Sequence, residues 1–245
     1  MKLKILYEDN HLIAVDKEPG VLSQGDITGE KPLVDIVKEY IKNEYQKPGR
    51  VFLGLVHRLD KDVSGVMVFA KTTKSARRLH SEFTKRSVIK IYVALVERFA
   101  EKSSGWTELA NNIIQNKGFS EISSAADTRS KKGIMRFMVV DENDTYSLIL
   151  IQLLTGRKHQ IRAQLSAFGY PVIGDAKYGS GHRCSHNAIC LHALCISFMH
   201  PAQKKVIKIF SEIPNSITER FRITDSTKMQ MHRIIESDFF EKNKG

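Results

Sequence analysis

The sequence predicts an α+β protein with a mixed, largely antiparallel β-sheet and flanking helices. Three observations lead to this prediction: apolar segments of strand length outnumber helical patterns, most are joined by hairpin-length links, and few helices stand between them. A chain of 245 residues, 42% of them hydrophobic, can bury one sizeable core. No internal repeat or interdomain linker is visible, so we predict a single domain over residues 1–223. Residues 224–245 are charged and weakly patterned, and we expect a tail or a loosely packed helix there.

The first third of the chain mixes strands with two amphipathic helices. The segment KILYEDNHLIAVDKEPGVLS predicts two strands joined by a tight turn and ended by a Pro-Gly pair. Between residues 32 and 45 apolar side chains recur at helical spacing, and Pro32 suits a first turn. VMVFAKT predicts a buried strand, and a helix follows over about residues 74–86 with Ala76, Leu79 and Phe83 toward the core.

The remaining segments are mainly strands. VIKIYVALVE, IMRFMVV, SLILIQLL, AICLHALCISFMHP and KKVIKIFSEIP each predict a strand, whereas residues 101–133 are polar and predict exposed hairpins and loops. TGRKHQIRAQLSAFGYP predicts a helix with Ile161, Leu165 and Phe168 on one face and Gly169 at its C-terminal end.

The net charge points to a polyanionic partner. Lys and Arg total 38 against 27 Asp and Glu, which gives +11 and an isoelectric point near 9.5. Nucleic acid is the favoured partner, because no strongly basic helix carries the broad apolar face of a membrane-surface segment. The alternative is a basic surface that merely keeps the protein soluble. No apolar run approaches 18 residues and no signal peptide is recognisable, so we expect a cytoplasmic protein with no membrane contact.

The sequence predicts neither a metal nor a cofactor. Three cysteines form no disulfide framework, and Cys184, Cys190 and Cys195 lack a paired C-x-x-C spacing. Four histidines stand among and beside them, namely His182, His186, His192 and His200, but no C-x-x-C pair accompanies them. The chain has no glycine-rich phosphate loop of the nucleotide-binding kinds.

The densest polar cluster is HRLDKDVSG, which stands between two apolar runs. Within it Asp60 has Arg58 and Lys61 close by in sequence, and such cations would keep the carboxylate ionised. An ionised carboxylate in a basic cleft can act as a nucleophile or a base on a polyanionic substrate. The alternative is a charged surface turn in which the aspartate pairs with an arginine.

A second cluster, TGRKHQIR, stands at the start of the helix predicted after SLILIQLL. The backbone N–H groups of a helix start favour an anion, and Arg157 and Lys158 would add phosphate contacts. His159 and Arg162 are three residues apart and should point to similar sides, so that the guanidinium can hold a carboxylate. A solvated basic helix face is the alternative. Tyr92 stands in the middle of a strand, where a lone tyrosine is more often part of the core.

Together these segments resemble RluA-type pseudouridine synthases. HRLDKDVSG, KIYVALVE, LLTGRKHQIRAQLSAFGYPVIGDAKYG and LHALCISFMHP occur in the order expected of that family, and the resemblance covers about residues 3–214. It implies that Asp60 is the catalytic aspartate, that Tyr92 stacks on the target base and takes part in proton transfer, and that Arg162 pairs with the catalytic carboxylate. Val63 departs from the pattern, because the family usually has threonine there.

The resemblance also implies the remaining contacts and the reaction. Arg58 would help extrude the target nucleotide, and the TGRKHQIR cluster would shape a central RNA-binding cleft, with the expected RNA contacts being Arg58, Arg157, Lys158, His159 and Gln160. The expected activity is isomerisation of chosen uridines in structured ribosomal or transfer RNA by a monomer without a cofactor. The alternative function is a non-catalytic RNA-binding protein on the same fold.

Overall fold

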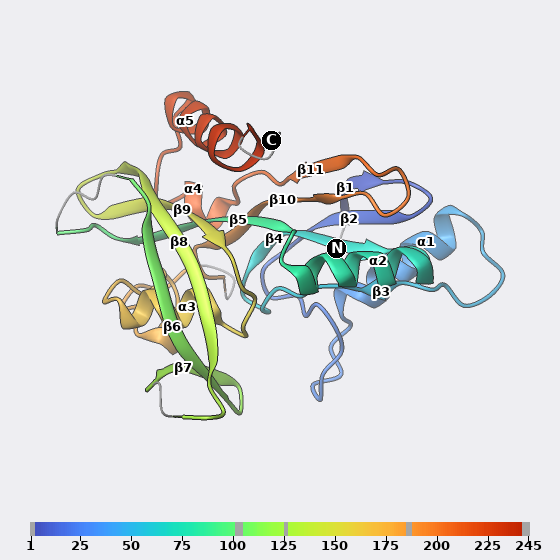
Figure 1. Ribbon diagram of the computed structural model, residues 1–245, viewed down its shortest axis with the longest axis horizontal. Helices are drawn as coiled ribbons and strands as arrows, with labels where there is room; N and C mark the ends of the chain where they lie inside the picture. Colours follow the sequence, from blue (N-terminus) through green and yellow to red (C-terminus); the bar gives the residue numbers. More distant parts are fainter. Residues whose placement is uncertain (1–2, 101–104, 125–126, 185–187, 242–245) are drawn as a thin grey trace. The chain divides into compact units, whose positions relative to one another are not determined.

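The computed structural model describes residues 3–100, 105–124, 127–184 and 188–241 (Figure 1). They form two compact units. The first contains residues 1–90, 186–188 and 193–212, and the second contains residues 91–185, 189–192 and 213–245. The boundary expected at residue 223 stays a prediction.

The first unit is built on a β-sheet. Its strands follow the order β1-β2-β4-β10-β11, with the short β3 paired to β4. The strand bounds are β1 Lys4–Glu8, β2 Leu12–Lys17, β3 Gly54–Leu55, β4 Ser64–Ala70, β10 Leu191–Met199 and β11 Val206–Phe210. The pairs β1–β2, β2–β4, β3–β4 and β10–β11 are antiparallel. Every residue of β4 is buried, which explains why its sequence is a continuous apolar run instead of an alternating one.

Two helices accompany this sheet, as the sequence predicts. They are α1, Leu33–Glu44, and α2, Thr73–Lys85. The Thr72 side chain caps α2 by accepting a hydrogen bond from the Ser75 N–H at 3.1 Å. Leu79 is fully buried in a core formed with side chains of β2, β4, β10 and β11, and Ala76 and Phe83 pack against that core. The same helix therefore turns its charged side chains to solvent.

The second unit contains a five-stranded antiparallel sheet in the order β5-β9-β8-β6-β7. The strand bounds are β5 Ile89–Glu97, β6 Thr107–Asn116, β7 Phe119–Ser123, β8 Lys131–Glu142 and β9 Tyr146–Leu153. Strands β6 and β7 form a regular hairpin, in agreement with the hairpins expected within residues 101–133. Ile113 and Ile114 are buried there, which gives the polar segment an apolar anchor.

The helical elements of this unit include α3, which packs against β6 and β7 (Figure 1). Their bounds are α3 Gln160–Ala167, η1 Ala176–Tyr178, α4 Asn215–Thr218, α5 Asp225–Ile235 and η3 Glu236–Glu241. The predicted helix starts later than expected, because His159 adopts a left-handed conformation with φ 51°. Phe168 lies just past α3 and is 42% exposed, so it does not extend the buried face of the helix.

The C-terminal segment forms a helix with buried side chains. Met231 and Ile235 of α5 are 4% and 1% exposed. The Thr227 hydroxyl donates to Asp141 of β8, and the Trp106 indole N–H donates to Asp238 at 2.7 Å. These contacts attach the helix to the sheet of the second unit. Within the described residues, no helix is long and apolar enough to span a bilayer.

Candidate active site

The loop that carries Asp60 is fastened by the segment that follows β2. The Ser23 hydroxyl donates to the Leu59 carbonyl at 2.6 Å and accepts from the Leu59 N–H at 3.1 Å. The Gly20 N–H donates to the Lys61 carbonyl at 2.8 Å. The Asp60 carbonyl in turn accepts from the Val63 N–H at 3.2 Å, which closes a tight turn. The backbone on both sides of Asp60 is therefore fixed.

Lys17, the last residue of β2, provides a second clamp on this loop. Its side chain is fully buried, and Nζ donates to the carbonyls of Glu18, Lys61 and Val63 at 3.0, 2.9 and 2.7 Å. Three acceptors match the three N–H groups of an ammonium. Burial lowers the pKa of Lys17 to about 7, whereas the nearby carboxylates of Asp62 and Asp60 raise it. When protonated, Lys17 is thus a buried positive charge near the loop that carries the candidate catalytic carboxylate.

Other side chains of HRLD have distinct environments. The His57 ring stacks on Phe83 with centroids 5.1 Å apart, and Nε2 accepts from the Val68 N–H at 2.9 Å. Burial, followed by the charge of Lys90, lowers the pKa of His57 to about 3, so this histidine is neutral and structural. Arg58 is exposed and Asp60 is half-buried. These exposures suit the roles expected of the two residues.

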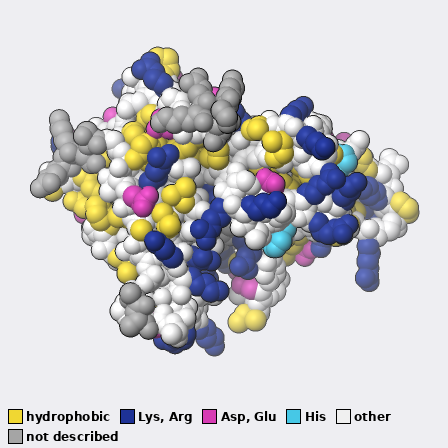
Figure 2. Space-filling view, in the orientation of Figure 1, with side chains coloured by type: hydrophobic (Ala, Val, Ile, Leu, Met, Phe, Trp, Pro, Cys, Tyr) yellow, Lys and Arg dark blue, Asp and Glu magenta, His cyan; other side chains and the backbone are white. Residues whose placement is uncertain are grey.

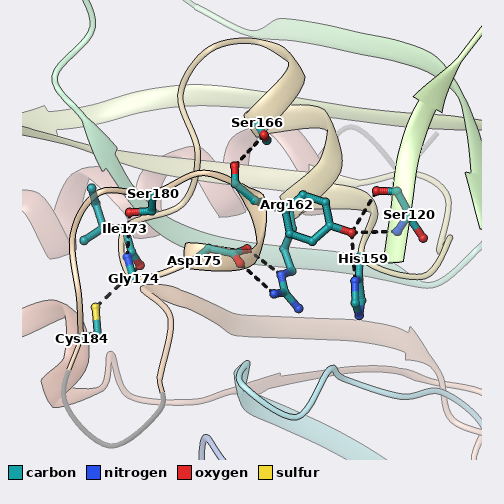
Figure 3. Close-up of polar contacts among 10 residues, drawn as sticks. Ser120, His159, Arg162, Ser166, Ile173, Gly174, Asp175, Ser180 and Cys184 are labelled. Carbon is teal, nitrogen blue, oxygen red and sulfur yellow. Dashed lines mark hydrogen bonds and ion pairs between the residues drawn. The ribbon is translucent and has the colours of Figure 1, made fainter. Parts of the chain in front are cut away.

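In the second unit, the hydroxyl of Tyr178 joins α3 to the β6–β7 hairpin (Figure 3). It accepts from the Ser120 N–H and donates to the Ser120 carbonyl, both at 3.0 Å. Because the hydroxyl proton is used in this way, the 3.0 Å contact with His159 Nδ1 requires His159 to donate. Burial, then the charges of Arg162 and Lys158, lower the pKa of His159 to about 3. His159 is therefore neutral at pH 7, with Nε2 left as an acceptor.

Arg162 is held by a carboxylate that the sequence analysis did not single out. Its Nε and Nη2 donate to the two oxygens of Asp175 at 2.6 and 2.8 Å, and both side chains are almost fully buried (Figure 3). The guanidinium also lies 5.0 Å from the centre of the Tyr178 ring. His159 and Arg162 thus converge on one tyrosine, in agreement with the prediction that they point to similar sides.

The TGRKHQIR turn is organised by the amide of Gln160. Its oxygen accepts from the Thr155 hydroxyl at 2.7 Å and the Arg157 N–H at 3.0 Å, while its nitrogen donates to Gln164 at 3.0 Å. Gln160 is only 2% exposed, so a direct contact with RNA stays a prediction that its burial opposes. Lys158 is exposed, and Arg157 is half-buried with Nε donating to the Lys132 carbonyl. Both remain predicted phosphate contacts.

The described part of the chain shows how the cysteines lie among the histidines around them. Among the residues that the structure describes, no group of three His, Cys, Asp or Glu side chains is arranged to hold a metal ion; His186 lies outside those residues. The thiols of Cys184 and Cys190 lie 3.3 Å apart. The hydrogen bond from Cys190, followed by the charge of Arg220 against the opposing effect of burial, lowers the pKa of Cys184 to about 6.

Comparison with known proteins gives the family. A family model described as RNA pseudouridylate synthase matches residues 11–167, a range that includes both HRLD and GRKHQIR. The chain belongs to this family.

Several relatives of the pseudouridylate synthase family have similar sequences. Ribosomal large subunit pseudouridine synthase C of Buchnera aphidicola is 33% identical over 84% of this chain and 65% of its own length. The RNA pseudouridine synthase YjbO of Bacillus subtilis is 32% identical over 89% and 75%. Ribosomal large subunit pseudouridine synthase D of Zymomonas mobilis is 28% identical over 90% and 72%. The chain thus spans about two thirds to three quarters of the length of these relatives.

A solved structure has the same fold. Human RNA Pseudouridylate Synthase Domain Containing 4 superimposes with a TM-score of 0.72 over 94% of this chain and 93% of its own. The two sequences are 21% identical, so this likeness concerns the fold alone. It agrees with the α+β class predicted from the sequence.

Four residues that support the candidate groups were not predicted from the sequence. They are Lys17, Ser23, Asp175 and Tyr178. The signal for two of them was present in GDAKYG, which belongs to the block that carries the resemblance. The pairing of Arg162 with Asp60 and the stacking role of Tyr92 stay predictions. Tyr92 is 8% exposed in β5, opposite Ile151 of β9.

Proposed function

We propose that the protein is an RNA pseudouridine synthase in which Asp60 is the catalytic carboxylate. The observation that carries the proposal is the match of the family to residues 11–167, which contains Asp60 in a loop whose backbone is clamped on both sides. A half-buried carboxylate on a loop with a fixed backbone is suited to react repeatedly in one geometry.

In the proposed reaction the bond between uracil N1 and the ribose C1′ breaks, the base rotates, and C5 bonds to C1′. The proton on C5 is lost and N1 gains one, so the reaction is an isomerisation without change of redox state. Asp60 would either attack C1′ or remove the neighbouring ribose proton. Such a reaction needs neither a metal nor a redox cofactor, because no hydride or phosphoryl group is transferred.

Several further residues would support the reaction. Asp175 and Tyr178 fix the plane of the Arg162 guanidinium, which supports its proposed role of holding a carboxylate in place. Tyr92 would stack on the target base, and Arg58 would fill the space that the extruded nucleotide leaves. Arg157, Lys158 and His159 would contact the RNA near its phosphates.

Structured RNA is the proposed substrate. The names of two relatives specify the large ribosomal subunit, which favours ribosomal RNA over transfer RNA for this chain too. The excess of 11 positive charges supports binding to the phosphate backbone, and such binding should weaken as salt rises. We propose that the protein acts in the cytoplasm as a monomer.

The test is a carbodiimide-based map of pseudouridine in total cellular RNA with and without the gene. We expect one or a few sites to disappear and to return with wild-type protein but not with Asp60→Asn. Asp60→Asn should bind RNA within a few-fold of wild type, because it keeps the loop and its clamps. Normal turnover by Asp60→Asn would refute the assignment, and RNA binding by the wild type with no product from any unmodified transcript would favour the non-catalytic alternative.

A further inference from the structure

The solvent side of α2 is a concentrated positive surface. We define the basic face of α2 as Lys74, Arg77, Arg78, Lys85 and the C-terminal cap residue Arg86, all of which are exposed. From Lys74 to Lys85 the helix rises about 16 Å, at about 1.5 Å per residue. Lys and Arg side chains crowd the surface over this helix (Figure 2). The face is thus long enough to lie along a stretch of RNA backbone.

These cations are not balanced by neighbouring carboxylates. Among the described residues none of the five forms an ion pair, and Arg78 instead donates to a backbone carbonyl, that of Pro201. The one acidic side chain of α2, Glu82, accepts from the Ser87 hydroxyl at 2.6 Å. Burial, followed by the charge of Arg86, lowers the pKa of Lys90 to about 8, which agrees with an excess of positive charge at this end of the helix.

Three lysines elsewhere on the first unit are ion-paired. Lys31 contacts Glu39 at 2.5 Å, Lys38 contacts Asp35 at 3.1 Å, and Lys61 contacts Glu30 at 2.7 Å. On the basic face of α2, by comparison, five cations that form no ion pair within the described part of the chain follow one side of a single helix, and such a row is complementary to the phosphates of an RNA backbone.

The helix leads directly to the candidate catalytic loop. Phe83, in the last turn of α2, stacks on His57, the first residue of HRLD. Arg86 follows that turn, and the exposed Arg58 follows His57. An RNA strand that runs along the basic face toward the C-terminal end of α2 would therefore arrive next to the loop that carries Asp60.

We propose that the basic face of α2 is a binding track for the backbone of the substrate RNA, which it leads toward the Asp60 loop. This inference rests on the proposed function. The contacts are to phosphates, so the track adds affinity and orientation without reading the base sequence. The track would also bind RNA through residues outside the HRLDKDVSG and TGRKHQIR clusters.

The experiment compares two triple variants that lose the same charge. One is Lys74→Gln/Arg77→Gln/Lys85→Gln. The other is Lys4→Gln/Lys31→Gln/Lys38→Gln, in which all three removed cations are ion-paired in the wild type. Binding of a labelled stem–loop RNA is measured at several salt concentrations, and thermal melting checks that both variants are folded.

The α2 variant loses three phosphate contacts, so its slope of log affinity against log salt should be shallower than that of the wild type by about 2. Between about 50 and 200 mM salt, the affinity of the wild type should therefore fall by about 16-fold more than the affinity of the α2 variant. The control should keep the wild-type slope. Equal slopes for both variants, or an α2 variant that binds as the wild type does, would overturn the track. Failure of wild-type protein to make pseudouridine, with the slopes still different, would remove the proposed reaction and leave the track in place.

Discussion

Replacing Lys17 with methionine tests the buried ammonium beside the Asp60 loop. Methionine has a similar length and fills the same space without a charge or an N–H group. In the wild type the ammonium holds three backbone carbonyls, two of which belong to Lys61 and Val63 in the loop. Removing it should loosen the loop, so turnover should fall more than RNA affinity does.

The lowered pKa of Lys17 also predicts how the free energy of unfolding depends on pH. Folding lowers the pKa of Lys17 from 10.5 to about 7, so the unfolded chain binds more protons than the folded chain between these values. This buried charge costs the folded state about 4 kcal/mol at pH 7 and about 2 kcal/mol at pH 9. Stability of the wild type relative to Lys17→Met should therefore rise by about 2 kcal/mol from pH 7 to pH 9, and should change little below pH 6, where both states are protonated.

Urea unfolding of both proteins at pH 6, 7, 8 and 9 measures this difference. Lys38→Met is the matched control, because the Lys38 side chain is 40% exposed and its removal should give a difference that does not change with pH in this way. A difference between wild type and Lys17→Met that stays constant from pH 7 to pH 9, or that falls, would refute the conclusion that burial lowers the pKa of Lys17.

Three further predictions concern other parts of the chain. Asp175→Asn should lower the free energy of unfolding by about 3–5 kcal/mol in chemical denaturation, because it leaves the Arg162 guanidinium buried opposite a neutral amide. Iodoacetamide at pH 7 should modify Cys184 faster than the other two cysteines, as seen by peptide mass spectrometry, because its pKa is lowered to about 6 and the others are buried. Gly65→Ala should destabilise the fold by about 3 kcal/mol or more in thermal melting, because φ is +116° and a Cβ would lie 2.3 Å from a β10 carbonyl.

Each of these has a control within the chain. Asp127→Asn removes the half-buried partner of the exposed Arg129 and should cost much less than Asp175→Asn. An equal decrease in the free energy of unfolding for Asp127→Asn and Asp175→Asn would contradict the conclusion that burial makes the Arg162–Asp175 pair costly to break. Uniform labelling of the three cysteines would contradict the lowered pKa of the thiol. Gly49→Ala meets open space and should be tolerated, so similar melting of the two alanine variants would contradict the steric argument.

Sequence patterns predicted the element types well, because burial dictates them directly. The continuous apolar run of β4 and the helical spacing of α2 each reflect one buried face. The left-handed turn at His159 has no such pattern, since a non-glycine residue enters that conformation only when its surroundings compensate. The predicted helix therefore extended too far toward its N-terminus.

Only part of the candidate site could be predicted, because local patterns identify some of its residues and long-range contacts supply the others. Asp60 and Arg162 stand in dense polar motifs that can be recognised locally. Their supports are distant: Lys17 contacts a carbonyl 46 residues away, and Tyr178 contacts Ser120, 58 residues away. Such pairs follow from the register of strands and the path of loops, which one sequence does not specify.

The clamps on the Asp60 loop have a consequence for how substrates are chosen. A carboxylate on a loop tied to Lys17, Gly20 and Ser23 cannot travel far to meet its target. If the proposed reaction takes place, most of the conformational change must therefore occur in the RNA. The free energy needed to unstack and flip out a nucleotide depends on the RNA itself. Uridines in bulges, junctions and strained loops would be modified first, so the deformability of the RNA would act as a filter even where the protein reads no base.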